Sequence, residues 1–181
     1  MTTEFNIFQQ IKREFFALRN GVIADTLRRS GAPYKIIFGL NVPQIKEVAS
    51  HFGPDAELAR RLWENTSTRE SLLMAPMIMP TEAMDAEEAC RWIAESPAAE
   101  VTDILCHSLL RRRPDSFEFA SELAKSEEPM LRYAAMRLLW HHIQARTDEV
   151  KAIAGAELAR NDELTTGPAR QIIDEIAFWQ E

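Results

Sequence analysis

The sequence is poor in glycine and cysteine, and it has no long hydrophobic run. Only six of its 181 residues are glycine, and two, Cys90 and Cys106, are cysteine. Two cysteines make no disulfide framework, so reduced, buried thiols are expected. No apolar segment approaches the roughly 20 residues that a membrane-spanning helix needs, and we expect no membrane partner. The polar, amphipathic N-terminal segment does not resemble a secretory signal, which predicts a cytoplasmic location.

Segments that alternate apolar and polar residues are also lacking, so the sequence predicts no convincing β-strand. Ala, Leu, Glu and Arg dominate, and 46% hydrophobic with 27% charged residues is ordinary for a folded domain. There is no glycine-rich phosphate loop, no nucleophile elbow and no Cys or His cluster with zinc spacing. His141 and His142 point about 100° apart on a helix and so do not share a metal. We therefore predict an all-α protein with no metal and no cofactor.

A short motif that reads as a helix end followed by a turn occurs four times, at 60–68, 91–99, 121–129 and 156–164. Aligned on their apolar anchors, the copies are 31, 30 and 35 residues apart, and these anchors are Leu62, Ile93, Leu123 and Leu158. A period in this range indicates stacked helical hairpins, because one such unit cannot bury its apolar face alone. We predict one domain over 1–181, with N-terminal helices in 4–51 and hairpins at 55–79, 85–112, 115–144 and 147–179.

Local signals place some of the helix ends and much of the core. Asn20 and Gly21 are predicted to end the first helix as a C-cap. Asn41 is predicted to cap the start of a helix that has Pro43 in its first turn. Core positions are expected at Leu72, Leu105 and Leu138 of successive hairpins, and at Trp63, Trp92 and Trp140 near hairpin ends.

The net charge of −7 opposes binding to duplex DNA, whose phosphates supply most non-specific affinity. The charge is uneven, however, because residues 111–146 hold seven basic against five acidic groups, so one face can still be basic. Arg111 and Arg113 would belong to such a face. Alternatively, these arginines form a solvated helix C-terminus that the helix dipole favours.

Two pairs of polar residues with helical spacing are candidates for a site. Asp103 and His107 are four apart on an otherwise apolar segment and share a helix face. The carboxylate can serve as a general base or stabilise developing positive charge. Alternatively, the two form an exposed Asp–His pair, or His107 is satisfied by a neighbouring repeat. Tyr133 and Arg137 have the same spacing on the next hairpin, where they could face Asp103, although Tyr133 fits equally well as a boundary aromatic.

Segments 15–31, 36–50 and 59–79 resemble the AlkD-like DNA alkylation-repair glycosylases. The resemblance rests on a Gly–x–x–x–Pro stretch, a Leu-Trp-acid helix end and an Arg-Glu pair, found here as Gly39 with Pro43, Leu62-Trp63-Glu64 and Arg69-Glu70. It implies a right-handed α-α superhelix of HEAT-like hairpins with a basic concave groove for duplex DNA. It also implies excision of positively charged alkylated purines.

The match at the family's active site is partial. Asp103 falls on the acidic position, while Ala99 stands at the tryptophan position four residues earlier. The family's arginine position holds Tyr133, with Arg132 just before it and Arg137 one turn later. A second tryptophan position aligns loosely with Ile173.

These observations predict a DNA alkylation repair-like protein that binds double-stranded DNA and possesses, if active, N-glycosylase activity. Asp103 is the expected catalytic residue, and the expected DNA-binding residues are Tyr133, Arg132, Arg137, His107, Arg111 and Arg113. The alternative is a non-catalytic HEAT-like scaffold that binds a protein or a different nucleic acid.

Overall fold

A computed structural model describes residues 2–180, with side chains from 7 to 179. The backbone in this range is helical with no strand, so the predicted all-α class is confirmed; the one bridge is an isolated parallel pairing of Ile36 with Thr68. No helix in the described range combines the length and the apolar character that crossing a membrane requires. The helices group into two compact units, which divide between Ala83 and Met84 and are described separately.

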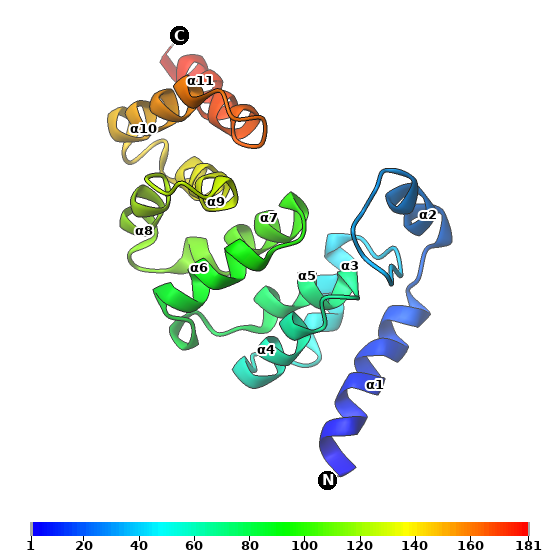
Figure 1. Cartoon of the computed structure of the whole chain (residues 1–181). Helices are drawn as coiled ribbons and strands as arrows, with labels where there is room; N and C mark the ends of the chain where they lie inside the picture. The colour runs from blue at the N-terminus through cyan, green and yellow to red at the C-terminus, as the bar shows by residue number, and fades with distance from the viewer. Residues whose placement is uncertain (1, 181) are drawn as a thin grey trace. The chain divides into compact units, whose positions relative to one another are not determined.

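The first unit contains five α-helices and a short 3-10 helix (Figure 1). Helix α4 packs against α5, α5 against α3, and α3 against α1. The predicted core residues Trp63 and Leu72 are buried here, at 4% and 1% exposure. The elements are α1 (Thr2–Ala17), α2 (Gly21–Arg29), α3 (Val42–Ser50), α4 (Ala56–Glu64), α5 (Arg69–Ile78) and η1 (Thr81–Ala83).

The Arg-Glu pair at the start of α5 is a structural lock for the loop before α3. Glu70 is fully buried, and its carboxylate accepts hydrogen bonds from the backbone N–H groups of Phe38, Gly39 and Leu40 at 2.9–3.3 Å. Arg69 Nη1 donates to Leu40 O and to Glu70 Oε1, which compensates the buried charge. Gly39 has φ +83, and a Cβ there would lie 2.2 Å from Asn20 O. Only glycine fits, because both the φ value and the close approach exclude a side chain.

The two asparagine caps have different outcomes. Asn41 caps α3 through a reciprocal capping box with Gln44, and Pro43 lies in the first turn as predicted. The prediction that Asn20 and Gly21 end the first helix is wrong. Asn20 is the N-cap of α2, where its side chain accepts hydrogen bonds from Val22 N and Ile23 N, and Gly21 is the first residue of that helix.

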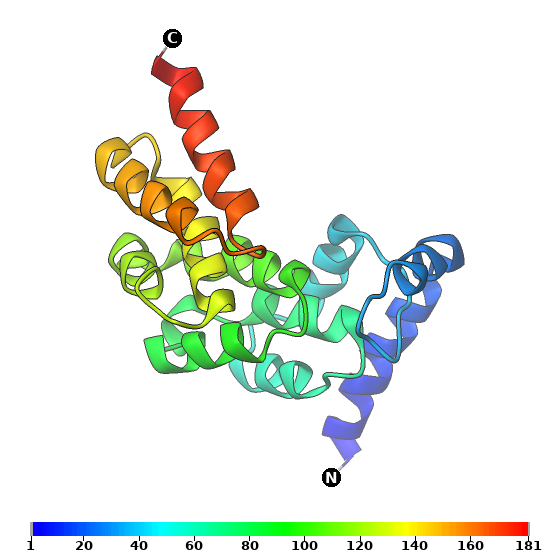
Figure 2. The same ribbon diagram turned by 45° about the horizontal axis from the view of Figure 1, so that its top comes forward.

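In the second unit α9 is the central element. Helices α6, α7, α8 and α11 all pack against it, and α10 packs against α11, as Figure 2 shows for the orange and red helices. The predicted core residues Trp92, Leu105 and Leu138 are at most 2% exposed. The elements are α6 (Ala86–Glu95), α7 (Ala99–Ser108), η2 (Leu110–Arg112), α8 (Ser116–Leu123), α9 (Pro129–Leu139), η3 (Trp140–His142), α10 (Thr147–Arg160) and α11 (Thr166–Gln180).

The four repeat anchors do not all occupy equivalent environments. Leu62, Ile93 and Leu123 are buried near the ends of α4, α6 and α8. Leu158 is only half-buried, and its neighbour Glu157 is buried in its place at 3% exposure. The last hairpin, α10–α11, therefore buries a carboxylate near the end of its first helix, where the earlier repeats bury an aliphatic side chain.

Candidate functional site

Asp103 on α7 meets Tyr133 and Arg137 on α9 inside the second unit. The Tyr133 hydroxyl donates to Asp103 Oδ1 at 2.9 Å, and Arg137 Nε lies 2.8 Å from the same oxygen. Helix α7 packs on α9, and Tyr133 and Arg137 are four positions apart, so they share the face of α9 that meets Asp103. The structure therefore brings together three of the residues singled out by helical spacing.

Asp103 and Arg137 line a hollow of about 470 Å³. Asp103 and Arg137 each keep 35% of the side chain exposed, so the ion pair is open to a ligand from solvent. The wall consists of Asp103, Ile104, Cys106, His107, Arg137, Trp140, His141 and Gln171. A carboxylate, an indole ring, two imidazoles and a primary amide thus converge on one space, which supplies the convergent polar groups that fix a ligand's orientation.

Burial and the carboxylate hold the neighbouring acids in their protonated forms. Burial, then the hydrogen bond to Asp103, raises the pKa of the Tyr133 phenol well above its ordinary range. Burial, then the nearby Asp103 charge, raises the pKa of the Cys106 thiol likewise. At neutral pH Tyr133 is therefore a hydrogen-bond donor, and Cys106 is an inert thiol that donates to Ala134 O.

Two histidines face each other across the hollow. The rings of His107 and His141 are 5.9 Å apart between centroids and inclined by 40°. Burial lowers the pKa of His141, and the positive groups Arg111, His107, His142 and Arg137 lower it further. His141 is thus held neutral at pH 7, although its ordinary pKa lies only about half a unit lower.

Trp140 and Gln171 are site residues that the sequence reasoning missed. The prediction that Trp140 packs in the core is wrong, because its side chain is 38% exposed and lines the hollow from η3. Gln171 is exposed on α11 and reaches the same hollow from the last hairpin. Trp140 lies seven residues after Tyr133, two helical turns on, and this spacing was the available signal.

Comparison with known families supplies the decisive observation about identity. The sequence profile of the family described as "DNA alkylation repair enzyme" matches residues 11–166. The chain belongs to this family. Comparison with curated proteins and with solved structures found no match. The family supports a role in DNA repair for this chain.

Within this member of the family, the two positions where the resemblance expects tryptophan bear no aromatic ring. Ala99 is the first residue of α7, and Ile173 is half-buried on α11. The indole at the Asp103 hollow comes instead from Trp140, a position that the resemblance does not predict.

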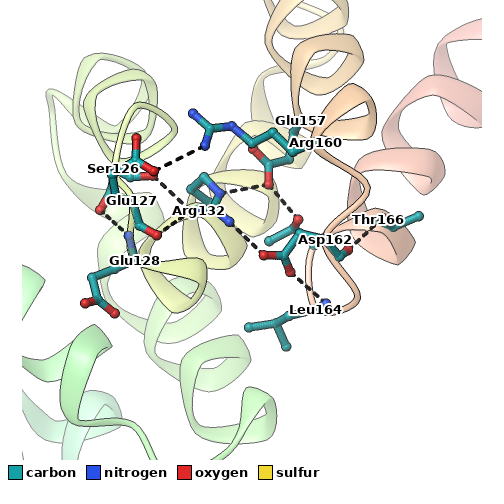
Figure 3. Close-up of polar contacts among 10 residues, drawn as sticks. Ser126, Glu127, Glu128, Arg132, Glu157, Arg160, Asp162, Leu164 and Thr166 are labelled. Atoms are coloured by element: carbon teal, nitrogen blue, oxygen red, sulfur yellow. Dashed lines mark hydrogen bonds and ion pairs between the residues drawn. The ribbon is translucent and has the colours of Figure 1, made fainter.

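Arg132 lies apart from the hollow, in a buried ion-pair network (Figure 3). Its guanidinium bonds Glu157 Oε1 at 2.9 Å, Asp162 Oδ2 at 2.8 Å and the carbonyl oxygens of Ser126 and Glu127. The side chain is only 5% exposed. Each of its three nitrogens donates to a protein group, so Arg132 fixes the α10–α11 hairpin to α9.

The remaining predicted DNA-binding arginines are divided. Arg113 forms a bidentate pair with Asp115 at 2.9 Å, donates to Met84 O and lies over the ring of Phe119. Arg111 is exposed in η2 and acts on His141 through its charge. A further arginine outside the predicted set, Arg170, is exposed on α11 beside Gln171. Arg111 and Arg170 therefore remain accessible to a partner, whereas Arg113 is engaged within the protein.

No group of three or more His, Cys, Asp or Glu side chains within the described range is arranged to hold a metal ion. The hollow offers the Asp103 carboxylate with its two positioning partners, the π face of Trp140, the neutral imidazole of His141 and the ring of His107.

Proposed function

We propose that this protein excises positively charged alkylated purines from duplex DNA, with Asp103 as the catalytic residue. The observation that carries the proposal is the placement of a carboxylate and an indole ring in one open hollow of the second unit. The family membership supports repair of alkylated DNA as the setting.

The reaction breaks the bond between the purine and C1′ of its deoxyribose. The electron pair of this bond leaves with the base, which neutralises the base's positive charge, and the sugar becomes an oxocarbenium-like cation. Water then adds to C1′ and loses a proton, which gives the free base and an abasic site. Because the leaving group is already cationic, the protein needs no general acid to protonate it.

Asp103 has one carboxylate oxygen available for this cation. Both Tyr133 and Arg137 use Oδ1, which leaves Oδ2 to face the sugar. The two donors fix the orientation of the carboxylate before substrate arrives, so little reorganisation accompanies the reaction. Its negative charge interacts more strongly with the developing cation than with the ground-state sugar, which is the condition for acceleration.

The other walls suit a cationic base. The indole of Trp140 offers a π face, and a cation held over such a face gains about 0.5–2 kcal/mol. A protonated His141 would repel the base, and the lowered pKa of this residue keeps it neutral. Exposed Arg111 and Arg170 are the candidates for contacts with the DNA phosphates.

The test is release of methylated purines from alkylated duplex DNA by the purified protein, with Asp103→Asn beside it. Asp174→Asn, an exposed carboxylate on α11, is the matched control. We expect Asp103→Asn to lose excision while duplex affinity stays nearly unchanged, because a transition-state interaction affects rate and not ground-state binding. Release at the spontaneous rate by the wild type would reject the enzyme and favour a non-catalytic scaffold, whereas full activity in Asp103→Asn would reject Asp103 as the catalytic residue.

A further inference from the structure

The first unit contains a second hollow, also of about 470 Å³, that the excision chemistry does not use. Its apolar wall includes Phe8 and Phe15 of α1 and Phe38 of the loop before α3. The rings of Phe15 and Phe38 lie 5.7 Å apart, inclined by 47°. Every residue that lines this hollow lies between Phe8 and Ser71, so the site is complete within the first unit.

Polar groups at one side of this hollow can pair with the edge of a flat ring. Asn65 Nδ2 donates to Ser71 Oγ at 3.1 Å, and Ser67 Oγ donates to Asn65 Oδ1 at 3.0 Å. The chain of bonds fixes the amide and leaves its second N–H proton and the Ser71 hydroxyl proton for a ligand. Aromatic walls with a few fixed donors and acceptors are the arrangement that binds an unstacked nucleobase.

Cations border the aromatic wall. The Arg61 guanidinium lies 4.6 Å from the centroid of the Phe8 ring, and Lys12 lines the same hollow. Lys12 is exposed and forms no ion pair with any side chain between residues 7 and 179. The Lys12 ammonium is therefore accessible to an anion at the same hollow that would receive the base.

A shallower hollow on the other side of α1 repeats this combination. It is lined by Gln9, Lys12, Arg13, Phe16 and Ala17. Gln9 and Lys12 line both hollows, so the two hollows are adjacent. Phe16 is 56% exposed, and the Arg19 guanidinium lies 3.8 Å from its ring centroid.

We infer that the first unit binds single-stranded nucleic acid along α1, with one base in the Phe8 hollow, a neighbouring base on Phe16 and phosphates against Lys12 and Arg13. Aromatic platforms interleaved with cations are what an unpaired strand requires, because each nucleotide offers a ring and a negative charge. An acidic peptide satisfies the cations but not the aromatic hollow. A duplex satisfies the cations but keeps its bases stacked and inaccessible. This site does not depend on excision at Asp103.

The experiment measures fluorescence anisotropy of a labelled deoxythymidine oligomer of about 12 nucleotides, a length within the usual site sizes. The full-length wild type is compared with Lys12→Glu/Arg13→Glu and with Lys46→Glu, an exposed lysine of α3 outside both hollows. We expect the double variant to lose at least about tenfold in affinity and the salt slope to fall, since two phosphate contacts are lost. Lys46→Glu should bind within about twofold of the wild type, because it touches no phosphate.

Phe8→Leu tests the aromatic part of the site while it retains an apolar side chain for α1. Loss of base stacking should weaken binding by roughly 5- to 150-fold, and circular dichroism melting confirms the fold. Lys12→Glu/Arg13→Glu should excise methylated purines from duplex DNA at the wild-type rate, which separates this site from the Asp103 hollow. Equal binding by wild type and double variant, a double variant that loses as much affinity for duplex DNA as for the oligomer, or full competition by polyglutamate would each overturn the inference.

Discussion

Tyr133 donates its phenol proton to Asp103 Oδ1 across the α7–α9 contact, at 2.9 Å. The phenol is held protonated because burial and the carboxylate raise its pKa. The same oxygen lies 2.8 Å from Arg137 Nε in an ion pair, so two residues one turn apart on α9 set the direction of one carboxylate. This relationship makes Asp103 a group of fixed orientation and not a mobile surface acid.

Tyr133→Phe should slow excision without abolishing it. The variant keeps the ring and removes one donor to a charged group, an interaction worth about 1.5–3 kcal/mol, so the carboxylate orients less well. We expect a rate between those of the wild type and Asp103→Asn in single-turnover assays. Tyr34→Phe, at the buried tyrosine of the first unit, is the control and should retain the wild-type rate. An unchanged rate in Tyr133→Phe would mean that Arg137 alone positions Asp103.

Trp140→Ala should selectively reduce the excision of cationic bases. Loss of the π face removes about 0.5–2 kcal/mol, which corresponds to roughly a 2- to 30-fold fall in kcat/KM, and Trp140→Phe should recover part of it. Stability should change little, because the side chain is 38% exposed. Trp179→Ala alters an exposed tryptophan near the end of α11 and should leave kcat/KM unchanged. A similar loss for both variants would show that Trp140 does not contact the base.

Much of the fold followed from the sequence because it depends on local patterns. The helical periodicity that predicted Leu105 and Leu138 as core residues reflects their burial against adjacent helices. The start of α3 was predictable because the Asn41 side chain itself caps the helix. The prediction that Asn20 ends the first helix failed because an asparagine before a glycine can either end one helix or cap the start of the next. The backbone of Gly39 lies close to Asn20, which explains why residue 39 is a glycine. This contact joins residues 19 positions apart, so only the tertiary structure reveals it.

The site was less predictable, for a geometric reason. Tyr133 and Arg137 are four apart and share a face, whereas Arg132 is turned by about 100° from Tyr133. Arg132 and Tyr133 therefore cannot both point to Asp103. The helical spacing alone could have shown that Tyr133 shares the face of Arg137 and that Arg132 does not. The partners of Arg132 could not be foreseen, since Glu157 and Asp162 are 25 and 30 residues away in sequence. The role of Trp140 likewise depends on where α9 ends and η3 begins.

Glu157→Gln should destabilise the second unit strongly. The substitution removes a charge that is 2% exposed and leaves Arg132 without one of its two carboxylate partners. Breaking a buried pair in this way costs about 3–5 kcal/mol. Urea unfolding gives the comparison, with Glu122→Gln as control, because the Glu122–Lys125 pair is exposed and should contribute under about 1 kcal/mol. A loss for Glu157→Gln no larger than the control's would show that the network does not hold the last hairpin.

The free energy of unfolding should fall as the pH is lowered from about 7.5 to 5.5. The pKa values of His141 and His142 are lowered in the folded protein, chiefly by burial, so the unfolded chain binds more protons once the pH reaches their ordinary value near 6.5. Stability therefore rises with pH through this window and is lost below it. The lowered pKa of Asp115 acts in the same direction, but only below about pH 4, so the two effects are separable. His141→Gln should flatten the pH dependence measured by urea unfolding, whereas His51→Gln in the first unit, whose side chain is 52% exposed, serves as the control. An unfolding free energy that increases on acidification through this window would contradict the neutral state assigned to His141.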